Sequence, residues 1–456
     1  MRVIQIALCS LLLTNLATVA VPRDPAPPNI VLIVSDDQAW SDYGFMGHGE
    51  IRTPHIDRLA REGVTFRRGY VPTALCRPSL SSMITGLYAH QTRITGNDPA
   101  DTGENREHTD RAEVDARELL IAHIDGLPTL PRLLAARGYL SLQTGKWWEG
   151  NFRRGGFTHG MTRGYPEKGG RHGDDGLKIG REGLGPIADF IDEARTAERP
   201  FFVWYAPFLP HTPHNPPARL LETYQQEGCP QPIAKYFAMC TWFDETCGEL
   251  LALLEEKGVA DDTLVAYVTD NGWIQEPETR GYARRSKRSP YEGGVRTPIL
   301  FRWPGTLAPA ERPELCTSLD LVPTLLAAAG AEAPDGLPGL NLLPHLRDGS
   351  RVERDTLFGE SFAHDIADIE DPEASLIHRW VIRGRDKLIL TYDGRPGRMK
   401  FPPEDGAAQL YDLGADPWEL ENLAPQRPEL VEELRGLLDG WYAVEGRQVG
   451  VVPGAR

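Results

Sequence analysis

Four stretches of almost uninterrupted hydrophobic residues are the clearest pattern in the chain. They cover residues 29–35, 139–143, 201–206 and 263–269, and segments with the spacing of helices lie between them. Hydrophobic runs without polar alternation are typical of parallel strands that are buried on both faces. The pattern therefore predicts an α/β fold with a large, mixed and mostly parallel sheet flanked by helices.

Several other segments have the spacing and the end signals of helices. Thr53 and Pro54 suit a helix start, and Gly63 follows the last hydrophobic position of that segment. Further helices are expected at residues 128–137, 186–194, 234–257 and 428–442. The long polar segments that we expect to form loops over one edge of the sheet are residues 98–124, 150–185 and 207–232.

The pattern changes near residues 345–356, where a polar and charged segment interrupts it. Beyond this segment, residues 380–383, 387–392 and 409–412 have the composition of antiparallel strands. We therefore expect a large first domain at residues 25–348. A smaller C-terminal α+β subdomain with an antiparallel sheet is expected at residues 349–456.

The first twenty residues have the pattern of a secretory signal peptide. Arg2 gives a positive start, residues 3–13 are hydrophobic, and residues 18–20 are small enough to precede a cleavage site. The hydrophobic stretch is too short to span a bilayer, and no 18-residue hydrophobic stretch follows it. We therefore expect residues 1–20 to be removed, the protein to be secreted or periplasmic, and the mature chain to have no membrane span.

The composition excludes several classes of function. The chain has 456 residues, of which 41% are hydrophobic and 25% are charged, as in an ordinary globular protein. Its 65 Asp and Glu outnumber its 49 Lys and Arg, and the net charge of −16 argues against a nucleic-acid partner. An anionic substrate therefore needs a local basic pocket, because the overall charge repels it.

Polar groups follow each of the four hydrophobic runs. In chain order they are Asp36 and Asp37, Lys146, His211, and Asp270 and Asn271. Because the carboxyl ends of parallel strands meet at the edge of the sheet where ligands bind, we expect these side chains to converge. Carboxylate and amide oxygens suit Ca²⁺ or Mg²⁺ better than Zn²⁺. Asp36 and Asp37, and Asp270 and Asn271, are therefore the candidate metal ligands.

A cysteine at the start of an expected helix is the candidate nucleophile. Residues 72–86 read PTALCRPSLSSMITG, and Pro78 suits the first turn of a helix that begins near Cys76. The helix dipole and the free backbone N–H groups there favour a thiolate or a bound anion. A buried structural cysteine is an equally good interpretation of Cys76 taken alone.

Taken in order, these segments resemble the sulfatase family of the alkaline-phosphatase superfamily. The Cys-X-Pro-Ser sequence at Cys76 resembles the sulfatase signature. Residues 144–147, 210–213, 269–272 and 291–296 resemble further sulfatase segments, and residues 410–423 resemble the C-terminal domain of the family. The resemblance implies an alkaline-phosphatase-like fold and an arylsulfatase-like sulfuric ester hydrolase.

The resemblance also implies a mechanism. A formylglycine-generating enzyme oxidises Cys76 to formylglycine during maturation, and one hydroxyl of the hydrated aldehyde attacks sulfur while the other later expels sulfate. Residue 76 joins the Asp36–Asp37 and Asp270–Asn271 pairs as a ligand of Ca²⁺, with Mg²⁺ as the alternative. Lys146 and Lys287 bind the sulfate oxygens, and His211 assists the leaving alcohol. The expected substrate is a sulfated polysaccharide or a small sulfated molecule such as an aryl sulfate.

Two positions depart from the family pattern. Leu80 stands where sulfatases carry arginine, and it belongs to a helical hydrophobic stripe that is expected to pack in the core. Trp148 stands where they carry histidine. The candidates to replace these two groups are Arg77, Arg93, Arg153 and Arg154, and His90, His159 and His172.

These departures keep two other functions open. One is a phosphodiester or phosphonate monoester hydrolase of the same superfamily, since such sites bind similar tetrahedral anions. The other is a non-catalytic, sulfatase-like binding protein. Aromatic residues near the motifs are candidates to stack on sugar or aryl rings, and packing in the core or in loops is at least as good an interpretation. They are Trp147, Trp148, Phe152, Trp273 and Tyr282.

Overall fold

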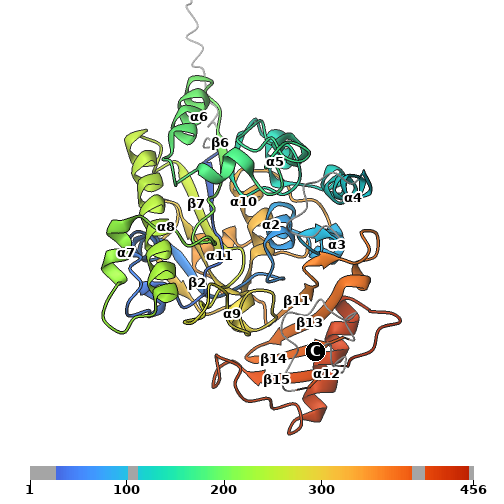
Figure 1. Ribbon diagram of the computed structural model, residues 1–456. Helices are drawn as coiled ribbons and strands as arrows, with labels where there is room; N and C mark the ends of the chain where they lie inside the picture. Colours follow the sequence, from blue (N-terminus) through green and yellow to red (C-terminus); the bar gives the residue numbers. More distant parts are fainter. Residues whose placement is uncertain (1–26, 101–110, 393–405, 451–456) are drawn as a thin grey trace, which may run out of the picture.

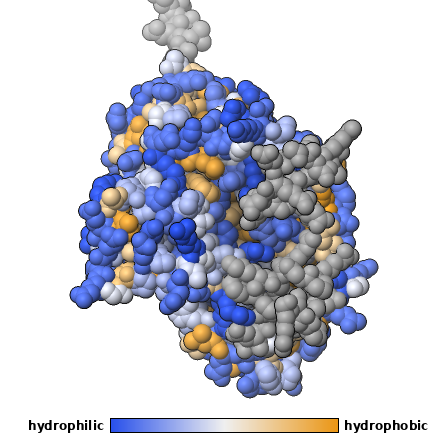
Figure 2. Space-filling view, in the orientation of Figure 1, coloured by the Kyte–Doolittle hydropathy of each residue, from blue (hydrophilic) through white to orange (hydrophobic). Residues whose placement is uncertain are grey.

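The computed structural model describes residues 27–100, 111–392 and 406–450, so the expected signal peptide at residues 1–20 lies outside the described residues. Figure 1 shows a larger α/β part and, at the lower right, a smaller part formed by the C-terminal segment. The face in Figure 2 is mostly hydrophilic, and its hydrophobic residues form small separate areas. Among the described helices, none has the length and hydrophobicity needed to span a membrane.

A nine-stranded sheet forms the centre of the larger part. Its strands are β1 (Asn29–Ser35), β2 (Val64–Tyr70), β4 (Leu140–Gly145), β5 (His159–Gly160), β6 (Phe201–Ala206), β7 (Thr263–Thr269), β8 (Arg296–Arg302), β9 (Ala310–Arg312) and β10 (Cys316–Thr317). The order is β10-β2-β8-β7-β1-β6-β4-β5, with β9 beside β2. Only the pairs that β8 forms with β2 and β7 are antiparallel among these strands. The predicted mixed and mostly parallel sheet is therefore confirmed.

The four hydrophobic runs form four neighbouring strands at the centre of this sheet. These strands, β7, β1, β6 and β4, are buried along almost their whole length. Alternate residues of β1 enter different clusters, Ile30 and Leu32 on one face and Val31 and Ile33 on the other. Both faces are therefore covered, as the absence of polar alternation predicts.

Helices provide that cover. The helices α1 (Pro54–Glu62), α6 (Gly185–Thr196) and α8 (Gln231–Glu256) pack on one face. The helices α2 (Cys76–Thr85), α5 (Leu130–Ala135), α10 (Leu321–Ala328) and α11 (Leu343–Asp348) pack on the other. The expected helices therefore form, with ends that differ from the predicted ones by up to three residues.

The remaining helices lie mostly within the segments between these elements. They are α3 (Ala89–Thr92), α4 (Arg111–Ala122), α7 (Ala218–Tyr224) and α9 (Glu292–Val295). Short 3-10 helices are η1 (Gly44–Met46), η2 (His123–Gly126), η3 (Phe152–Gly155), η4 (Asp174–Lys178), η5 (Ser318–Asp320) and η6 (Pro372–Ser375). The interpretation of residues 98–124 as a loop was wrong for α4. Its sequence is rich in Ala, Glu, Arg and Leu, which favour helices, although its hydrophobic period is weak.

The C-terminal part contains a second sheet. Its strands are β11 (Thr356–Phe362), β13 (Leu376–Arg383), β14 (Asp386–Thr391) and β15 (Ala408–Asp412), and all neighbours are antiparallel. The helix α12 (Pro428–Trp441) covers one face through Val431, Leu434 and Leu438 (Figure 1). The predicted antiparallel sheet is therefore confirmed, and the residue limits of the domains stay a prediction.

Many contacts join the C-terminal part to the larger part, among them a strand pair and a buried ion pair. The short strands β3 (Asp98–Pro99) and β12 (Asp365–Ile366) pair in parallel. The fully buried Lys387 of β14 places its Nζ 3.1 Å from Glu292 of α9 and 2.9 Å from Glu419. The C-terminal part is thus held beside the segment that leads into β8.

Candidate active site

The carboxyl ends of four neighbouring strands bring the predicted polar groups to one place. Asp36 and Asp37 follow β1, Lys146 follows β4, His211 lies five residues after β6, and Asp270 follows β7. The structure brings together all of the site residues predicted from the sequence, which are Asp36, Asp37, Cys76, Lys146, His211, Asp270, Asn271 and Lys287. A cavity of about 320 Å³ opens beside Cys76.

Three acidic groups and an amide form a buried cluster. The backbone N–H of Asp37 donates to Asp270 Oδ1 at 3.0 Å, and Asn271 Nδ2 donates to Asp37 Oδ1 at 2.7 Å. Burial raises the pKa of Asp36 well above its usual range and also raises the pKa of Asp270. Several carboxylates this close need cationic partners to stay ionised together.

Three oxygens of this cluster have no hydrogen-bond partner among the described residues. They are Asp36 Oδ2, Asp270 Oδ2 and Asn271 Oδ1. A buried polar atom without a partner is costly, and such atoms are rare in native structures. These are hard oxygen donors, so the donor set fits Ca²⁺ or Mg²⁺.

Two lysines that are far apart in the sequence contact the cluster. Lys146 Nζ donates to Asp36 Oδ1 at 2.8 Å. Lys287 Nζ donates to Asp37 Oδ1 and Oδ2 at 2.6 and 2.7 Å, and lies 3.2 Å from Cys76 Sγ. Burial opposes both charges, but the carboxylates outweigh it, and the pKa of each lysine is raised. Both lysines are therefore cations at neutral pH.

Cys76 is the first residue of α2, as the position of Pro78 predicts. The thiol is 1% exposed, and burial raises its pKa to about 12, against the effect of Lys146 and Lys287. Leu80, one turn later, is buried in the core with Met83 and Ile84, as expected from the hydrophobic stripe. Leu80 therefore contributes to packing and supplies no charge.

His211 is another of the side chains that line the cavity. Its Nε2 is 3.4 Å from Asp37 Oδ2, and its side chain is 19% exposed, whereas the Asp37 side chain is 0% exposed. Its Nδ1 donates to the Thr212 carbonyl, and its ring stacks on Phe208 at 4.3 Å. Burial lowers the pKa of His211 well below its usual range. These contacts keep a neutral imidazole between the cluster and the solvent.

The structure separates the candidates that could replace the two missing family groups. Arg77 is buried and donates to both carboxylate oxygens of Glu149. The other arginines lie elsewhere, Arg93 beside Glu370 and Arg154 beside Glu118 and Asp125, while Arg153 lies over the Phe152 ring. None of these four lines the cavity. The sequence-based candidates therefore contain no replacement arginine at the cavity.

One of the three candidate histidines lines the cavity, and it is His172. His90 bonds to Glu360, and His159 bonds to the Thr158 hydroxyl. The His172 ring lies 5.1 Å from Trp148, and its Nδ1 is buried without a hydrogen-bond partner among the described residues. Burial, with Lys146 nearby, lowers the pKa of His172 to about 3. An imidazole thus stands beside the position where the family carries one.

Further polar residues of the cavity were missed from the sequence. They are Asn97, Arg171, Arg288 and His364. Asn97 Nδ2 lies 3.2 Å from His364 Nε2, and Arg171 pairs with Asp98 and lies over Trp148. These residues lie in irregular segments, and His364 belongs to the C-terminal part, so no periodic pattern pointed to them. The only local signal was the basic pair Arg171 and His172 in a long loop.

Comparisons with known proteins agree with this geometry. Residues 28–331 match the family model described as Sulfatase, and residues 282–440 match N-sulphoglucosamine sulphohydrolase, C-terminal. Human arylsulfatase A is 29% identical over 94% of this chain and 90% of its own length. Pig N-acetylgalactosamine-6-sulfatase is 27% identical over 97% of this chain and 90% of its own length.

A solved structure of a protein in complex with its substrate D-glucosamine-2-N,6-O-disulfate has a TM-score of 0.67 to this chain. The two are 21% identical, over 91% of this chain and 97% of that chain. This likeness shows a shared fold over almost the whole length of both proteins.

Proposed function

Because the chain belongs to the sulfatase family and is a sulfuric ester hydrolase, we propose that it releases sulfate from a sulfated carbohydrate. The proposed chemistry uses a formylglycine made from Cys76 and a bound divalent cation. One observation carries this proposal: residue 76 faces two cationic lysines and a buried oxygen cluster that has three unpartnered oxygens.

The proposed cation ligands are Asp36, Asp37, Asp270, Asn271 and residue 76. The unpartnered oxygens Asp36 Oδ2, Asp270 Oδ2 and Asn271 Oδ1 are the donors that the protein does not use itself. Ca²⁺ is the favoured ion and Mg²⁺ the alternative, since both take oxygen ligands. When bound, the cation balances the buried carboxylates and polarises the sulfate group.

The proposed reaction also needs the residues around position 76. Formylglycine supplies a hydrated aldehyde, whose hydroxyl is the nucleophile toward sulfur. Lys287 Nζ, 3.2 Å from the side chain of residue 76, holds that side chain in place, and Lys146 and Lys287 offset the negative charge on the sulfate oxygens. His211 lines the cavity with its Nδ1 proton committed to the Thr212 carbonyl, so it first takes up a proton on Nε2 and then donates that proton to the departing alcohol.

We place His172 in the role that the family histidine has at the position of Trp148. His172 lines the same cavity as Cys76 and Lys146, and its unpartnered Nδ1 offers a site for a proton. Its low pKa keeps His172 neutral, so Nδ1 is free to take that proton from a hydroxyl at residue 76, and the proton is then passed on rather than retained. In this proposal the loop that carries His172 supplies the imidazole that the family has at the position of Trp148.

The cellular part of the proposal rests on the sequence and on the relatives. Residues 1–20 have the signal-peptide pattern, and so we propose export to the periplasm or the medium and maturation by a formylglycine-generating enzyme. The similarity to N-acetylgalactosamine-6-sulfatase supports a sugar sulfate as the substrate class.

Two measurements test this proposal. In protein from the native host, mass spectrometry of the peptide that carries residue 76 should find the lighter, aldehyde-bearing residue. The same protein should hydrolyse an aryl sulfate faster than an aryl phosphate diester, and Cys76→Ala should abolish turnover. An intact thiol in fully active protein contradicts the formylglycine mechanism, and faster hydrolysis of the phosphate diester favours the phosphodiesterase alternative.

A further inference from the structure

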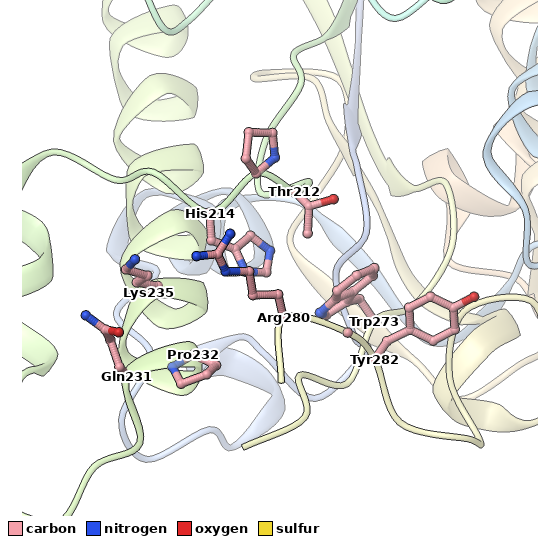
Figure 3. A pocket seen from close by; sticks show the side chains of 10 residues that line it. Thr212, His214, Gln231, Pro232, Lys235, Trp273, Arg280 and Tyr282 are labelled. Atoms are coloured by element: carbon pink, nitrogen blue, oxygen red, sulfur yellow. The ribbon is translucent and has the colours of Figure 1, made fainter. Parts of the chain in front are cut away.

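A second cavity lies beside the candidate active site. Its volume is about 530 Å³, and ligand sites commonly have about 300–1,000 Å³. The segment after β6, the first turns of α8 and the loop after β7 line it (Figure 3). The side chains that define its character are Thr212, His214, Lys235, Trp273, Arg280 and Tyr282.

The two cavities share a wall. Thr212, Trp273 and Tyr282 line both of them. The rings of Trp273 and Tyr282 pack together at 4.8 Å, and Lys287 Nζ lies 5.7 Å from the Trp273 ring centre. A substrate whose reacting group lies beside Cys76 and Lys287 therefore passes this aromatic pair as it extends into the second cavity. Aromatic rings offer a sugar a hydrophobic face with a polar edge.

The second cavity is lined by two cations and by no carboxylate of the described residues. Lys235 extends from α8 and Arg280 from the loop after β7. In Figure 3 Lys235 lies at the left and Tyr282 at the right, with Arg280 between them. Neither side chain forms a hydrogen bond or an ion pair with a described residue. His214 Nε2 is also buried there without a partner. Although the chain has a net charge of −16, the two cations make the second cavity attractive to an anion.

The loop that carries Arg280 is held in place by the buried Gln275. Its Nε2 lies 2.9, 2.8 and 3.0 Å from the carbonyl oxygens of Glu276, Thr279 and Gly281. Trp273 Nε1 donates to Gln275 Oε1 at 3.1 Å, so the same side chain also orients the shared wall. The backbone that carries Arg280 and the aromatic wall are therefore fixed relative to one another, which limits the space that the Arg280 side chain searches for an anion.

We propose that the second cavity binds a second anionic group of the substrate, a sulfate or a carboxylate on the sugar unit next to the one that carries the reacting sulfate. Lys235 and Arg280 hold this group by charge-assisted hydrogen bonds, and Trp273 and Tyr282 contact the sugar between the two anions. The inference rests on the proposed hydrolysis of a sulfated carbohydrate. It narrows the substrate to a saccharide with at least two acidic groups.

Steady-state kinetics on four defined compounds test the inference. Three are disaccharides that share one reacting sulfate ester and carry a second sulfate, a carboxylate or a hydroxyl on the neighbouring sugar, and the fourth is a small aryl sulfate. We expect KM to be about tenfold lower for the preferred anionic disaccharide than for the neutral one, equivalent to ~1.4 kcal/mol. The comparison of the second sulfate with the carboxylate identifies the preferred group. Added salt should weaken this preference, because the cations are partly exposed.

Variants locate the effect. Lys235→Ala and Arg280→Ala should each raise KM for the preferred disaccharide about tenfold while leaving kcat and the hydrolysis of the aryl sulfate unchanged. Lys235→Arg should retain a low KM because the charge is kept. Lys168→Ala is the matched control, since Lys168 is exposed and lines neither cavity. Unchanged aryl sulfate hydrolysis also shows that each variant is folded.

The outcomes separate this inference from the proposed function. If wild type hydrolyses the aryl sulfate but treats the neutral and anionic disaccharides alike, or if both alanine variants keep the wild-type KM, the inference is wrong and the proposed function stands. If wild type releases sulfate from none of the four compounds, the proposed function fails. In that case calorimetric binding of the disaccharides to wild type and to Lys235→Ala decides whether the cavity recognises a second anion.

Discussion

Trp148 and His172 show how the imidazole at a cavity wall can come from another part of the chain. The tryptophan occupies the place of the family histidine, and the His172 ring from a separate loop lies 5.1 Å from it. Because a cavity is defined by space rather than by chain order, an imidazole from either position faces the same volume. This explains why a departure in a local motif leaves the candidate site with an imidazole at this wall.

The first prediction tests this replacement. His172→Ala should lower kcat for an aryl sulfate roughly 100-fold, the size expected for the loss of a general acid or base. His90→Ala and His159→Ala should keep kcat close to that of wild type, since these side chains bond to Glu360 and Thr158 away from the cavity. If His172→Ala turns over like wild type, His172 has no catalytic role.

The second prediction concerns the buried carboxylates. Asp270→Ala removes one oxygen of the unpartnered set, so the affinity for Ca²⁺ should fall roughly tenfold or more. Chelation of wild type should abolish activity, and added Ca²⁺ or Mg²⁺ should restore it. Asp261→Ala is the control, because Asp261 is exposed and lies outside the cluster. Metal analysis after dialysis measures the affinity, and equal metal content in the two variants contradicts the assignment.

At the scale of elements, the site depends on how each strand ends. Gly145 closes β4 with φ +75°, and a Cβ there would lie 1.8 Å from the Ala206 carbonyl oxygen of the neighbouring strand β6. The close approach of the two strand ends lets the backbone N–H of Lys146 donate to the same carbonyl at 2.7 Å. A glycine is therefore needed to place the lysine beside Asp36.

The third prediction uses a pair of matched glycines. Gly145→Ala should lower both the melting temperature and kcat, because strand β4 must move away from β6 and carry Lys146 with it. Gly138→Ala is the control, since Gly138 has a similar φ of +83° with nothing near its Cβ position. It should cost only the ~1–2 kcal/mol of a left-handed residue and keep kcat. Equal losses in both variants contradict the close-approach explanation.

At the scale of the whole molecule, the C-terminal sheet supports the segment that carries Lys287. Lys387 lies between Glu292 and Glu419, and all three side chains are at most 1% exposed. The backbone N–H of Glu292 donates to Glu419 Oε2 at 2.5 Å. Because Glu292 is only five residues from Lys287 in the chain, loosening this contact also disturbs the site.

The fourth prediction tests that support. Lys387→Met leaves the buried Glu419 without its cation and leaves Glu292 with Arg296 as its cation, at 3.6 Å, which should cost about 3–5 kcal/mol, measured by denaturant unfolding. Burial already raises the pKa of Glu419 to about 7, so folding favours its protonated form, and the loss should be smaller at pH 6 than at pH 8. Lys168→Met, at an exposed position, should have no effect. A loss that does not change with pH contradicts a role for the Glu419 charge.

The sequence by itself determined which residues can form the sheet and what stands at the strand ends. Uninterrupted hydrophobic runs encode burial on both faces, and the rule that parallel strands end at one edge then places Asp36, Lys146 and Asp270 together. His211 follows the third run in the same way, whereas Lys287 came from motif resemblance, which adds no geometry of its own. The groups at the strand ends could be predicted because the hydrophobic pattern that marks a buried strand is formed by residues that are neighbours in the sequence.

Only the tertiary structure decided which residues complete the walls of the cavities. His172 lines the cavity and His90 and His159 do not, and His364 of the C-terminal part lines it too. The packing of loops without a periodic pattern decides this. The second cavity likewise joins α8 to a loop held by Gln275, and the two are far apart in the chain. Side chains from distant loops meet only through the packing of the elements between them, so no local pattern in the sequence records that they meet.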